Sequence, residues 1–242
     1  MKTSVTCFSL FVLLLLVGCS NEKEQPKVIY EETSPVTIET KIDSSNIRIA
    51  DLPIHLEGTS YLIHPLGDIR VYQNNSRSSY GSGKTNTISY SISNYNRYEL
   101  TGYLENIKFQ HKDSTSLHLL TNKKVQIQTV TYPFAFAERT KQPLLIYTLV
   151  DMDTNRDGNL DSNDIKSLYI SNIDGSNFTK LSVPFHELID WNIIDLKNRL
   201  YFRTTEDINK NGAFDKNDAI HYQYVDLLAK EWVVETYNPI EN

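Results

Sequence analysis

The sequence predicts an all-β fold of antiparallel strands. The chain has 15 tyrosines, and from Ile47 onward Ile, Val, Thr and aromatic residues form short runs that often alternate with polar residues. Clusters of Asn, Asp, Gly and Ser separate these runs, as turns between strands require. No segment shows a convincing helical period. With 40% hydrophobic and 22% charged residues, the composition is that of an ordinary globular protein.

The candidate strands follow one another at short intervals. A loop is predicted from Asn74 to Asn86, where Gly81 and Gly83 lie. The strands are expected at residues 60–64, 69–72, 87–93, 99–109, 116–120, 125–132, 144–151, 167–173, 179–183, 188–194, 199–204, 219–226 and 231–236.

The C-terminal half contains an internal repeat. Two similar loops begin at Asp153 and Asp207, and each can be read as the centre of a unit with two strands before the loop and two after it. The units cover residues 125–183 and 188–236, and the loops begin 54 residues apart. This length suits a four-stranded propeller blade, for which roughly 40 to 50 residues are usual. This favours small or partial β-propeller-like repeats. A β-sandwich uses the same short strands and remains the alternative.

Residues 153–164 resemble an EF-hand calcium loop. Calcium takes roughly six to eight oxygen ligands, and Gly158 permits the sharp turn that brings them together. The expected ligands are Asp153, Asn155, Asp157, the Asn159 carbonyl, Asp161 and Asp164. Residues 207–218 repeat the pattern with Asp207, Asn209, Asn211, the Ala213 carbonyl, Asp215 and Asp218. The alternative is that both segments are merely turns between strands.

The last position of each loop departs from the EF-hand pattern. Asp164 and Asp218 stand where an EF-hand usually has glutamate, and in this respect the loops are similar to those of dockerins. Dockerin loops continue into a helix. Here the continuations alternate or are β-branched and aromatic, so a strand is predicted after each loop.

The N-terminus resembles the signal peptide of a bacterial lipoprotein. Lys2 precedes an apolar run from Phe8 to Val17, and Leu16-Val17-Gly18-Cys19 is similar to a lipobox. The run is shorter than the roughly 20 apolar residues of a spanning helix. The resemblance implies that residues 1–18 are removed and that Cys19 carries acyl chains such as palmitate, which anchor the protein in a membrane.

The resemblance also implies a location in the cell envelope. Ser20 is unlike the aspartate that retains lipoproteins in an inner membrane, so an outer-membrane lipoprotein is expected. Its domain would face the periplasm or the cell surface, and Glu22 and Glu24 faintly resemble surface-export signals. Residues 19–46, polar and interrupted by Pro26 and Pro35, are predicted to be a lipidated flexible tether. Residues 47–242 would form a single all-β domain.

Charge and cysteine content exclude several classes of function. The net charge is −6 and no basic block is present, so nucleic acid is not an expected partner. The two cysteines, Cys7 and Cys19, leave no pair for a disulfide in the domain. Calcium is therefore expected to stabilise the fold in place of a disulfide. No histidine stands at metal-ligand spacing from a carboxylate, and no nucleophile elbow is present. The histidines are His55, His64, His111, His118, His186 and His221.

These observations predict a membrane-anchored, calcium-binding module that binds or supports other molecules and has no catalysis of its own. An envelope protein or a glycan is the expected ligand, and tyrosines of the N-terminal half are candidates for stacking on it. They are Tyr80, Tyr90, Tyr95, Tyr98 and Tyr103. An envelope hydrolase acting on glycans is the first alternative and requires two carboxylates about 5 to 10 Å apart in a cleft. A dockerin-like adhesion module is the second.

Overall fold

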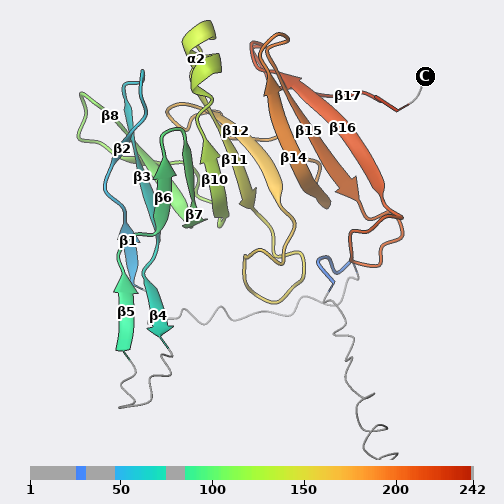
Figure 1. Cartoon of the computed structure of the whole chain (residues 1–242), viewed down its shortest axis with the longest axis horizontal. Helices are drawn as coiled ribbons and strands as arrows, with labels where there is room; N and C mark the ends of the chain where they lie inside the picture. The colour runs from blue at the N-terminus through green and yellow to red at the C-terminus, as the bar shows by residue number, and fades with distance from the viewer. Residues whose placement is uncertain (1–25, 31–46, 75–84, 241–242) are drawn as a thin grey trace, which may run out of the picture.

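The computed structural model describes residues 26–30, 47–74 and 85–240, and this part is all-β with antiparallel sheets, as predicted (Figure 1). The predicted signal peptide, Cys19, most of the predicted tether, Tyr80 and the loop residues 75–84 lie outside the described residues. Within the described ranges, no helix has the length and apolar character needed to cross a membrane.

Three sheets and one two-stranded ribbon make up the fold. The first sheet contains β1 (Arg48–Ala50), β2 (Ile54–His55), β3 (Tyr61–Asp68), β8 (Asn106–His111) and β9 (His118–Leu119). The second contains β6 (Ser93–Asn96), β7 (Glu99–Leu104), β10 (Gln126–Thr131), β11 (Leu144–Val150), β12 (Ser167–Asn172) and β13 (Thr179–Lys180). The third contains β14 (His186–Ile194), β15 (Arg199–Glu206), β16 (Ala219–Asp226) and β17 (Val234–Thr236). The ribbon pairs β4 (Arg70–Asn74) with β5 (Thr85–Ser89).

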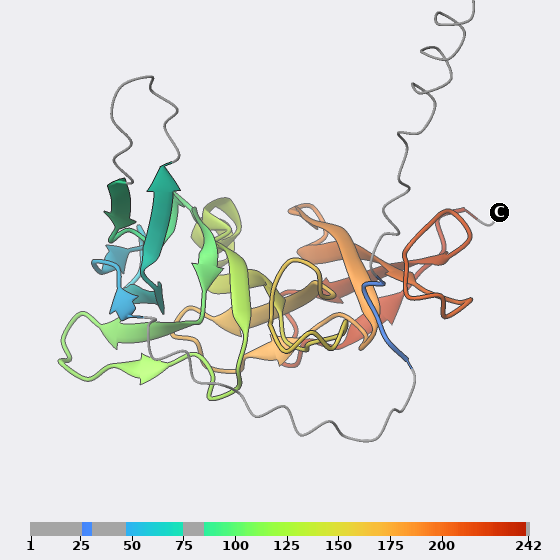
Figure 2. The ribbon, with the colours of Figure 1, turned by 90° about the horizontal axis from the view of Figure 1, so that it is seen from below.

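The second sheet is buried on both faces, and alternate side chains of β11 enter two different cores. Successive side chains of a strand point to opposite faces. Leu145, Tyr147 and Leu149 join a core shared with the first sheet. Leu144 and Ile146 join a separate core shared with the third sheet. The three sheets therefore stack one after another, with the second sheet in the middle (Figures 1 and 2). This arrangement is consistent with either a partial propeller or a sandwich.

The internal repeat is present in the structure. In the second sheet the strand order is β10, β11, β12, β13, and in the third it is β14, β15, β16, β17, with the predicted loop between the second and third strand of each set. A register shift also recurs in the first strand of each set, between Ile127 and Thr129 and between Leu188 and Asp190.

The prediction that no helix is present is wrong. A short helix, α2 (Phe134–Thr140), connects β10 to β11. Pro133 precedes it and Lys141 ends it with a left-handed φ of 59°. Phe136 is buried in the core between the second and third sheets. Seven residues are too few to show a helical period against the surrounding strands. A helix this short is not stable alone, and burial of Phe136 stabilises it.

The strand predicted at 99–109 is in fact two strands in different sheets. β7 belongs to the second sheet and β8 to the first, and the chain crosses between them at Glu105. Directly after the crossing, the buried Asn106 side chain donates to the Thr121 carbonyl and accepts from the Ile107 amide. The strand predicted at 116–120 shortens to β9, while β1, β2 and β6 were not predicted as such.

We expect Ile146→Ala to lower the free energy of unfolding by about 2 to 5 kcal/mol, because it leaves a cavity in the core between two sheets. Leu196→Ala is the control, since this side chain is 90% exposed, and should change stability by less than about 0.5 kcal/mol. Urea denaturation of both variants measures the difference, and equal effects would contradict the two-faced burial of β11.

Candidate functional site

The two predicted calcium loops lie at the same end of the molecule, opposite α2 (Figure 1). The first loop, Asp153–Asp164, lies between β11 and β12, and the second loop, Asp207–Asp218, lies between β15 and β16. Both follow strands whose partners are fixed in antiparallel register. Each loop therefore starts and ends at positions that the sheet determines.

The first loop folds its carboxylates inward onto its own backbone. Asp153 accepts hydrogen bonds from the Asp157 and Gly158 amides, at 3.1 and 2.8 Å. Asn155 Oδ1 also accepts from the Asp157 amide, and Asp157 Oδ1 accepts from the Asn159 amide. Side chains at the first, third and fifth positions thereby bond to amides of the same turn, and these are the positions whose oxygens a calcium loop uses.

The second loop repeats this pattern bond for bond. Asp207 accepts from the Asn211 and Gly212 amides, at 3.2 and 2.7 Å. Asn209 Oδ1 also accepts from the Asn211 amide, and Asn211 Oδ1 accepts from the Ala213 amide. Equivalent hydrogen bonds at equivalent positions indicate that the sequence repeat specifies one loop conformation twice.

Backbone angles support the same equivalence. Arg156 and Lys210, the fourth residues of the loops, have φ values of 59° and 57°. Gly158 and Gly212, the sixth residues, have φ values of 89° and 81°. A side chain would be strained at the φ values of Gly158 and Gly212, which explains glycine at the sixth position of each loop.

The loops differ at their closing carboxylates. Asp164 is fully buried, and its Oδ1 accepts from the Thr154 amide at 2.7 Å and lies 3.2 Å from the Thr154 hydroxyl oxygen. The second loop has Ile208 in place of Thr154. Among the described residues, Asp218 Oδ1 is buried and has no hydrogen-bond partner. A buried carboxylate oxygen without a partner is costly, and a cation bound there would supply the missing interaction.

The donor set of both loops fits calcium. Carboxylates, asparagine side-chain oxygens and one backbone carbonyl per loop are hard oxygen ligands, which calcium prefers. The residues that would hold the ions are the predicted ones: Asp153, Asn155, Asp157, Asn159, Asp161 and Asp164 in the first loop, and Asp207, Asn209, Asn211, Ala213, Asp215 and Asp218 in the second. The uncompensated oxygen of Asp218 is the structural observation that favours a cation.

Residues Pro26–Tyr30, which we call the docked segment, lie between the two loops in both ribbon views (Figures 1 and 2). The Lys27 and Val28 amides donate to the Gly212 carbonyl at 2.6 and 3.2 Å. The Ile29 amide donates to the Thr154 carbonyl at 2.9 Å. The Thr154 hydroxyl donates to the Lys27 carbonyl at 2.8 Å. One short segment is thus hydrogen-bonded to both loops.

Side chains strengthen this attachment. Val28 is 2% exposed. The Lys27 ammonium lies 2.8 Å from Glu187, a carboxylate that also pairs with Lys166. The Tyr30 ring lies 6.0 Å from the Phe185 ring, measured between centroids. Burial, together with the charge of Asp207 and a hydrogen bond to it, raises the pKa of Tyr30 to about 12.

These five residues were predicted to belong to a flexible tether, and they are instead held against the domain. The physical reason is that Val28, Ile29 and Tyr30 form a short apolar group within an otherwise polar stretch. It is too short to be recognised from the sequence, yet long enough to fill the gap between two loops.

The backbone contacts to the docked segment use loop positions that are not predicted ligands. Thr154 lies between ligands Asp153 and Asn155, and Gly212 lies between Asn211 and Ala213. The Tyr30 side chain, in contrast, hydrogen-bonds to Asp207, the first predicted ligand of the second loop. Because each contact residue stands between two ligands, fixing the ligands also fixes the surface that the segment meets.

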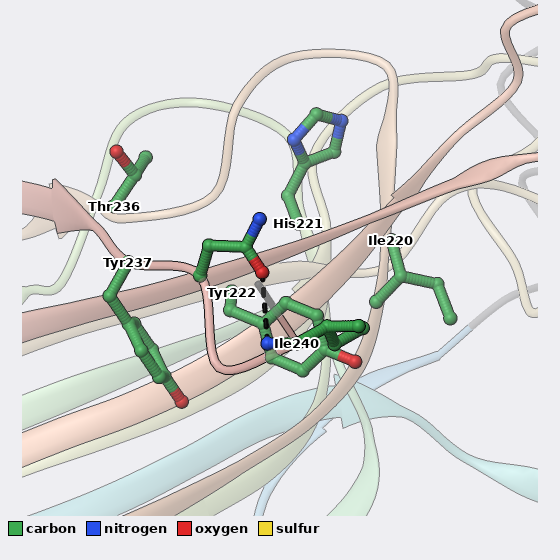
Figure 3. Close-up of a pocket in the computed structure, with 7 residues that line it drawn as sticks. Ile220, His221, Tyr222, Thr236, Tyr237 and Ile240 are labelled. Carbon is green, nitrogen blue, oxygen red and sulfur yellow. Dashed lines mark hydrogen bonds between the residues drawn. The ribbon is translucent and has the colours of Figure 1, made fainter. Parts of the chain in front are cut away.

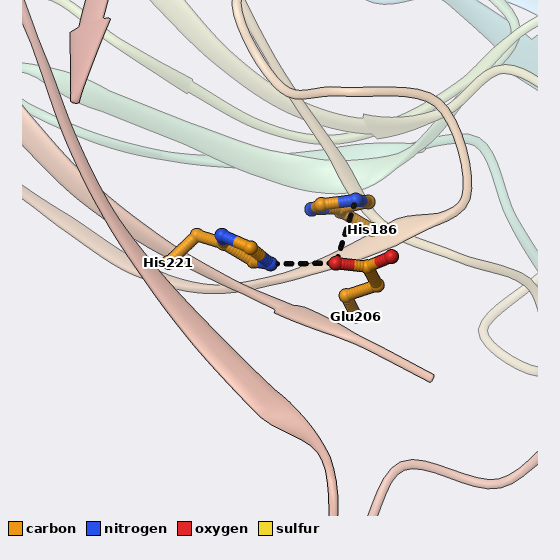
Figure 4. A group of neighbouring side chains, drawn as sticks. All are labelled: His186, Glu206 and His221. Atoms are coloured by element: carbon orange, nitrogen blue, oxygen red, sulfur yellow. Dashed lines mark hydrogen bonds and ion pairs between the residues drawn. The ribbon is translucent and has the colours of Figure 1, made fainter. Parts of the chain in front are cut away.

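A group of side chains that the sequence did not predict lies beside the second loop. His186, Glu206 and His221 place one ligand atom each within 4.8 Å of one another (Figure 4). Among the described residues, this is the one group of three or more His, Cys, Asp or Glu side chains that meets this spacing. Spacing along the sequence did not indicate this group, because strand pairing joins residues that are far apart in the chain.

A hollow with a volume of about 520 Å³ lies on the third sheet (Figure 3). Tyr222 and Tyr237 contribute rings to it, 5.9 Å apart between centroids. No carboxylate lines this hollow or the smaller one beside Trp232. The carboxylate pair of the hydrolase alternative is thus absent from both hollows.

The tyrosines singled out in the N-terminal half differ in their surroundings. Tyr90, Tyr95 and Tyr103 are exposed, and Tyr98 stacks on Phe134 with ring centroids 4.7 Å apart. A denser aromatic group lies on the third sheet instead and was not predicted. It consists of Tyr201, Tyr222, Tyr224 and Tyr237.

Known proteins do not indicate a function for this chain. Comparison with protein-family models and with curated proteins finds no match. The residues that follow Asp164 and Asp218 form strands β12 and β16, as predicted, and not the helices that a dockerin-like module would have. The site therefore consists of two strand-loop-strand units joined by the docked segment.

We expect Gly212→Ala to release the docked segment. A Cβ at this position would lie 2.4 Å from the Val28 carbonyl oxygen and would also be strained by the φ of 81°. Trypsin should then cleave after Lys27 faster than in the parent chain. The control is Gly58→Ala, which has a similar φ of 79° but lies near the flexible Glu138 side chain. Equal cleavage rates in the two variants would contradict this role of Gly212.

Proposed function

We propose that this chain is a calcium-binding lipoprotein of the bacterial cell envelope, anchored through Cys19, whose all-β domain is a binding or structural module without catalysis of its own. The observation that supports calcium is the buried, unpartnered Oδ1 of Asp218, which closes a loop whose hydrogen-bond pattern repeats that of the first loop. The lipobox-like segment before Cys19 supports the anchor. An outer membrane is the proposed location.

In this proposal, calcium also sets the distance between the domain and the membrane. Six residues separate Cys19 from Pro26, so a lipid anchor could lie at most about 25 Å from the docked segment. If the segment were released, the chain from Cys19 to Ile47 could extend to roughly 100 Å. Ions that order the two loops would therefore favour a domain held close to the membrane.

The proposed partners are the membrane, through the lipid, and an envelope protein or a glycan. Aromatic rings beside a hollow suit such ligands, because they can stack on a sugar ring or on a peptide side chain. The hollow beside Tyr222 and Tyr237 is the surface that we assign to this role. Part of this hollow is formed by β16, the strand that directly follows the second loop.

Calcium should raise the melting temperature of the full chain, studied in detergent. At a concentration about 100 times the dissociation constant, each filled loop contributes about 2.7 kcal/mol, or roughly 5 to 10 °C for a domain of this size. Asp153→Ala and Asp207→Ala should each remove part of the rise, whereas Asp113→Ala, an exposed carboxylate outside the loops, should not. A melting temperature that is the same with calcium and with chelator would refute the calcium assignment.

The anchor is tested separately by replacing each cysteine. Cys19→Ser should abolish incorporation of labelled palmitate and move the protein out of the membrane fraction, because the thiol is the attachment point. Cys7→Ser, a change within the apolar run, is the matched control and should leave labelling intact. Labelling that persists in Cys19→Ser would show that the anchor has been misassigned.

A further inference from the structure

The group formed by His186, Glu206 and His221 lies on three neighbouring strands of the third sheet. His186 is the first residue of β14, Glu206 the last of β15, and His221 lies near the start of β16. His186 is paired directly with Glu206, and His221 is paired with Thr204, two residues before Glu206. The pairing register therefore brings all three side chains to one corner of the sheet.

The distances in this group suit a shared ion. Glu206 Oε2 lies 2.8 Å from His221 Nε2 and 3.9 Å from His186 Nε2 (Figure 4). Zinc binds imidazole nitrogen and carboxylate oxygen at about 2.0 to 2.2 Å, which places neighbouring ligand atoms roughly 3.4 Å apart in a tetrahedral site. Small side-chain rotations would bring the three atoms to that spacing.

A second contact orients His186 within this group. His186 Nδ1 lies 3.4 Å from the Thr204 hydroxyl, a contact on the ring nitrogen that does not face Glu206. Such a partner orients a ligating histidine.

We propose that His186, Glu206 and His221 form a zinc site that is chemically distinct from the two calcium loops. Two imidazoles and one carboxylate suit zinc, whereas calcium prefers sites made only of oxygen. Three protein ligands leave a fourth position for water or for an atom of a bound molecule. The Glu206 and His221 side chains are 44% and 35% exposed, so solvent reaches this position.

The site also lies next to the proposed calcium-dependent attachment. Glu206 directly precedes Asp207, the first ligand of the second loop, and His186 follows Phe185, which contacts Tyr30. An ion at this corner would fix the ends of β14, β15 and β16 relative to one another. It would thereby stabilise the third sheet where the second loop begins, whether or not the loops bind calcium.

Titration calorimetry tests this proposal with zinc chloride and the full chain in detergent. Cys7→Ser and Cys19→Ser remove competing thiols, and excess calcium fills any oxygen-only site. We expect one zinc ion per chain. His186→Ala and His221→Ala should weaken binding by about 100-fold, and Glu206→Gln by about tenfold. His55→Ala, which changes an exposed histidine, should bind as the parent does.

Two outcomes would overturn the proposal. The first is the absence of zinc binding by the parent chain. The second is unchanged affinity in both histidine variants, which would place the ion elsewhere. Circular dichroism melts show whether each variant folds, and His221→Gln, which keeps a polar side chain of similar length, replaces any alanine variant that does not. If Glu206 had only a structural role, Glu206→Gln would lower stability and leave the zinc affinity unchanged. That result would remove Glu206 from the proposed site.

Discussion

Burial of the second sheet on both faces is the constraint on which the rest of the structure depends. Leu145 and Tyr147 fill one core while Leu144 and Ile146 fill the other, so a register slip of one residue would exchange all of these contacts. At the end of β11, Asp151 accepts hydrogen bonds from Ser167, Tyr169 and Lys180. The first loop therefore leaves the sheet from a fixed point, and a metal-binding geometry can be built there without a disulfide.

Much of this arrangement could be predicted from the sequence, because it depends on local patterns. Alternating residues specify strands, and the recurrence of Asp153-x-Asn155-x-Asp157-Gly158 as Asp207-x-Asn209-x-Asn211-Gly212 specifies two loops of one conformation. The predicted strands after Asp164 and Asp218 are present for the same reason. Ion binding itself, and the lipid on Cys19, remain predictions.

The parts that could not be predicted depend on contacts between distant residues. The docked segment meets loops more than a hundred residues away, and nothing in Val28-Ile29-Tyr30 indicates that partner. His186, Glu206 and His221 come together only once the register of three strands is known. Beside the crossing at Glu105, the Asn106 side chain donates to the Thr121 carbonyl, a contact that no periodicity reveals.

If the loops bind ions as proposed, ion binding and segment docking form one equilibrium. Thr154 and Gly212 each stand between two proposed ligands, so an ion that orders a loop would lower the entropy cost of docking the segment. Linkage would then require the converse: docking would raise the affinity of each loop for its ion by the same factor. Since the segment contacts both loops, it would also couple the two ions to each other, although the loops belong to different sheets. A five-residue segment near a membrane anchor would thus convert two separate sites into one cooperative unit.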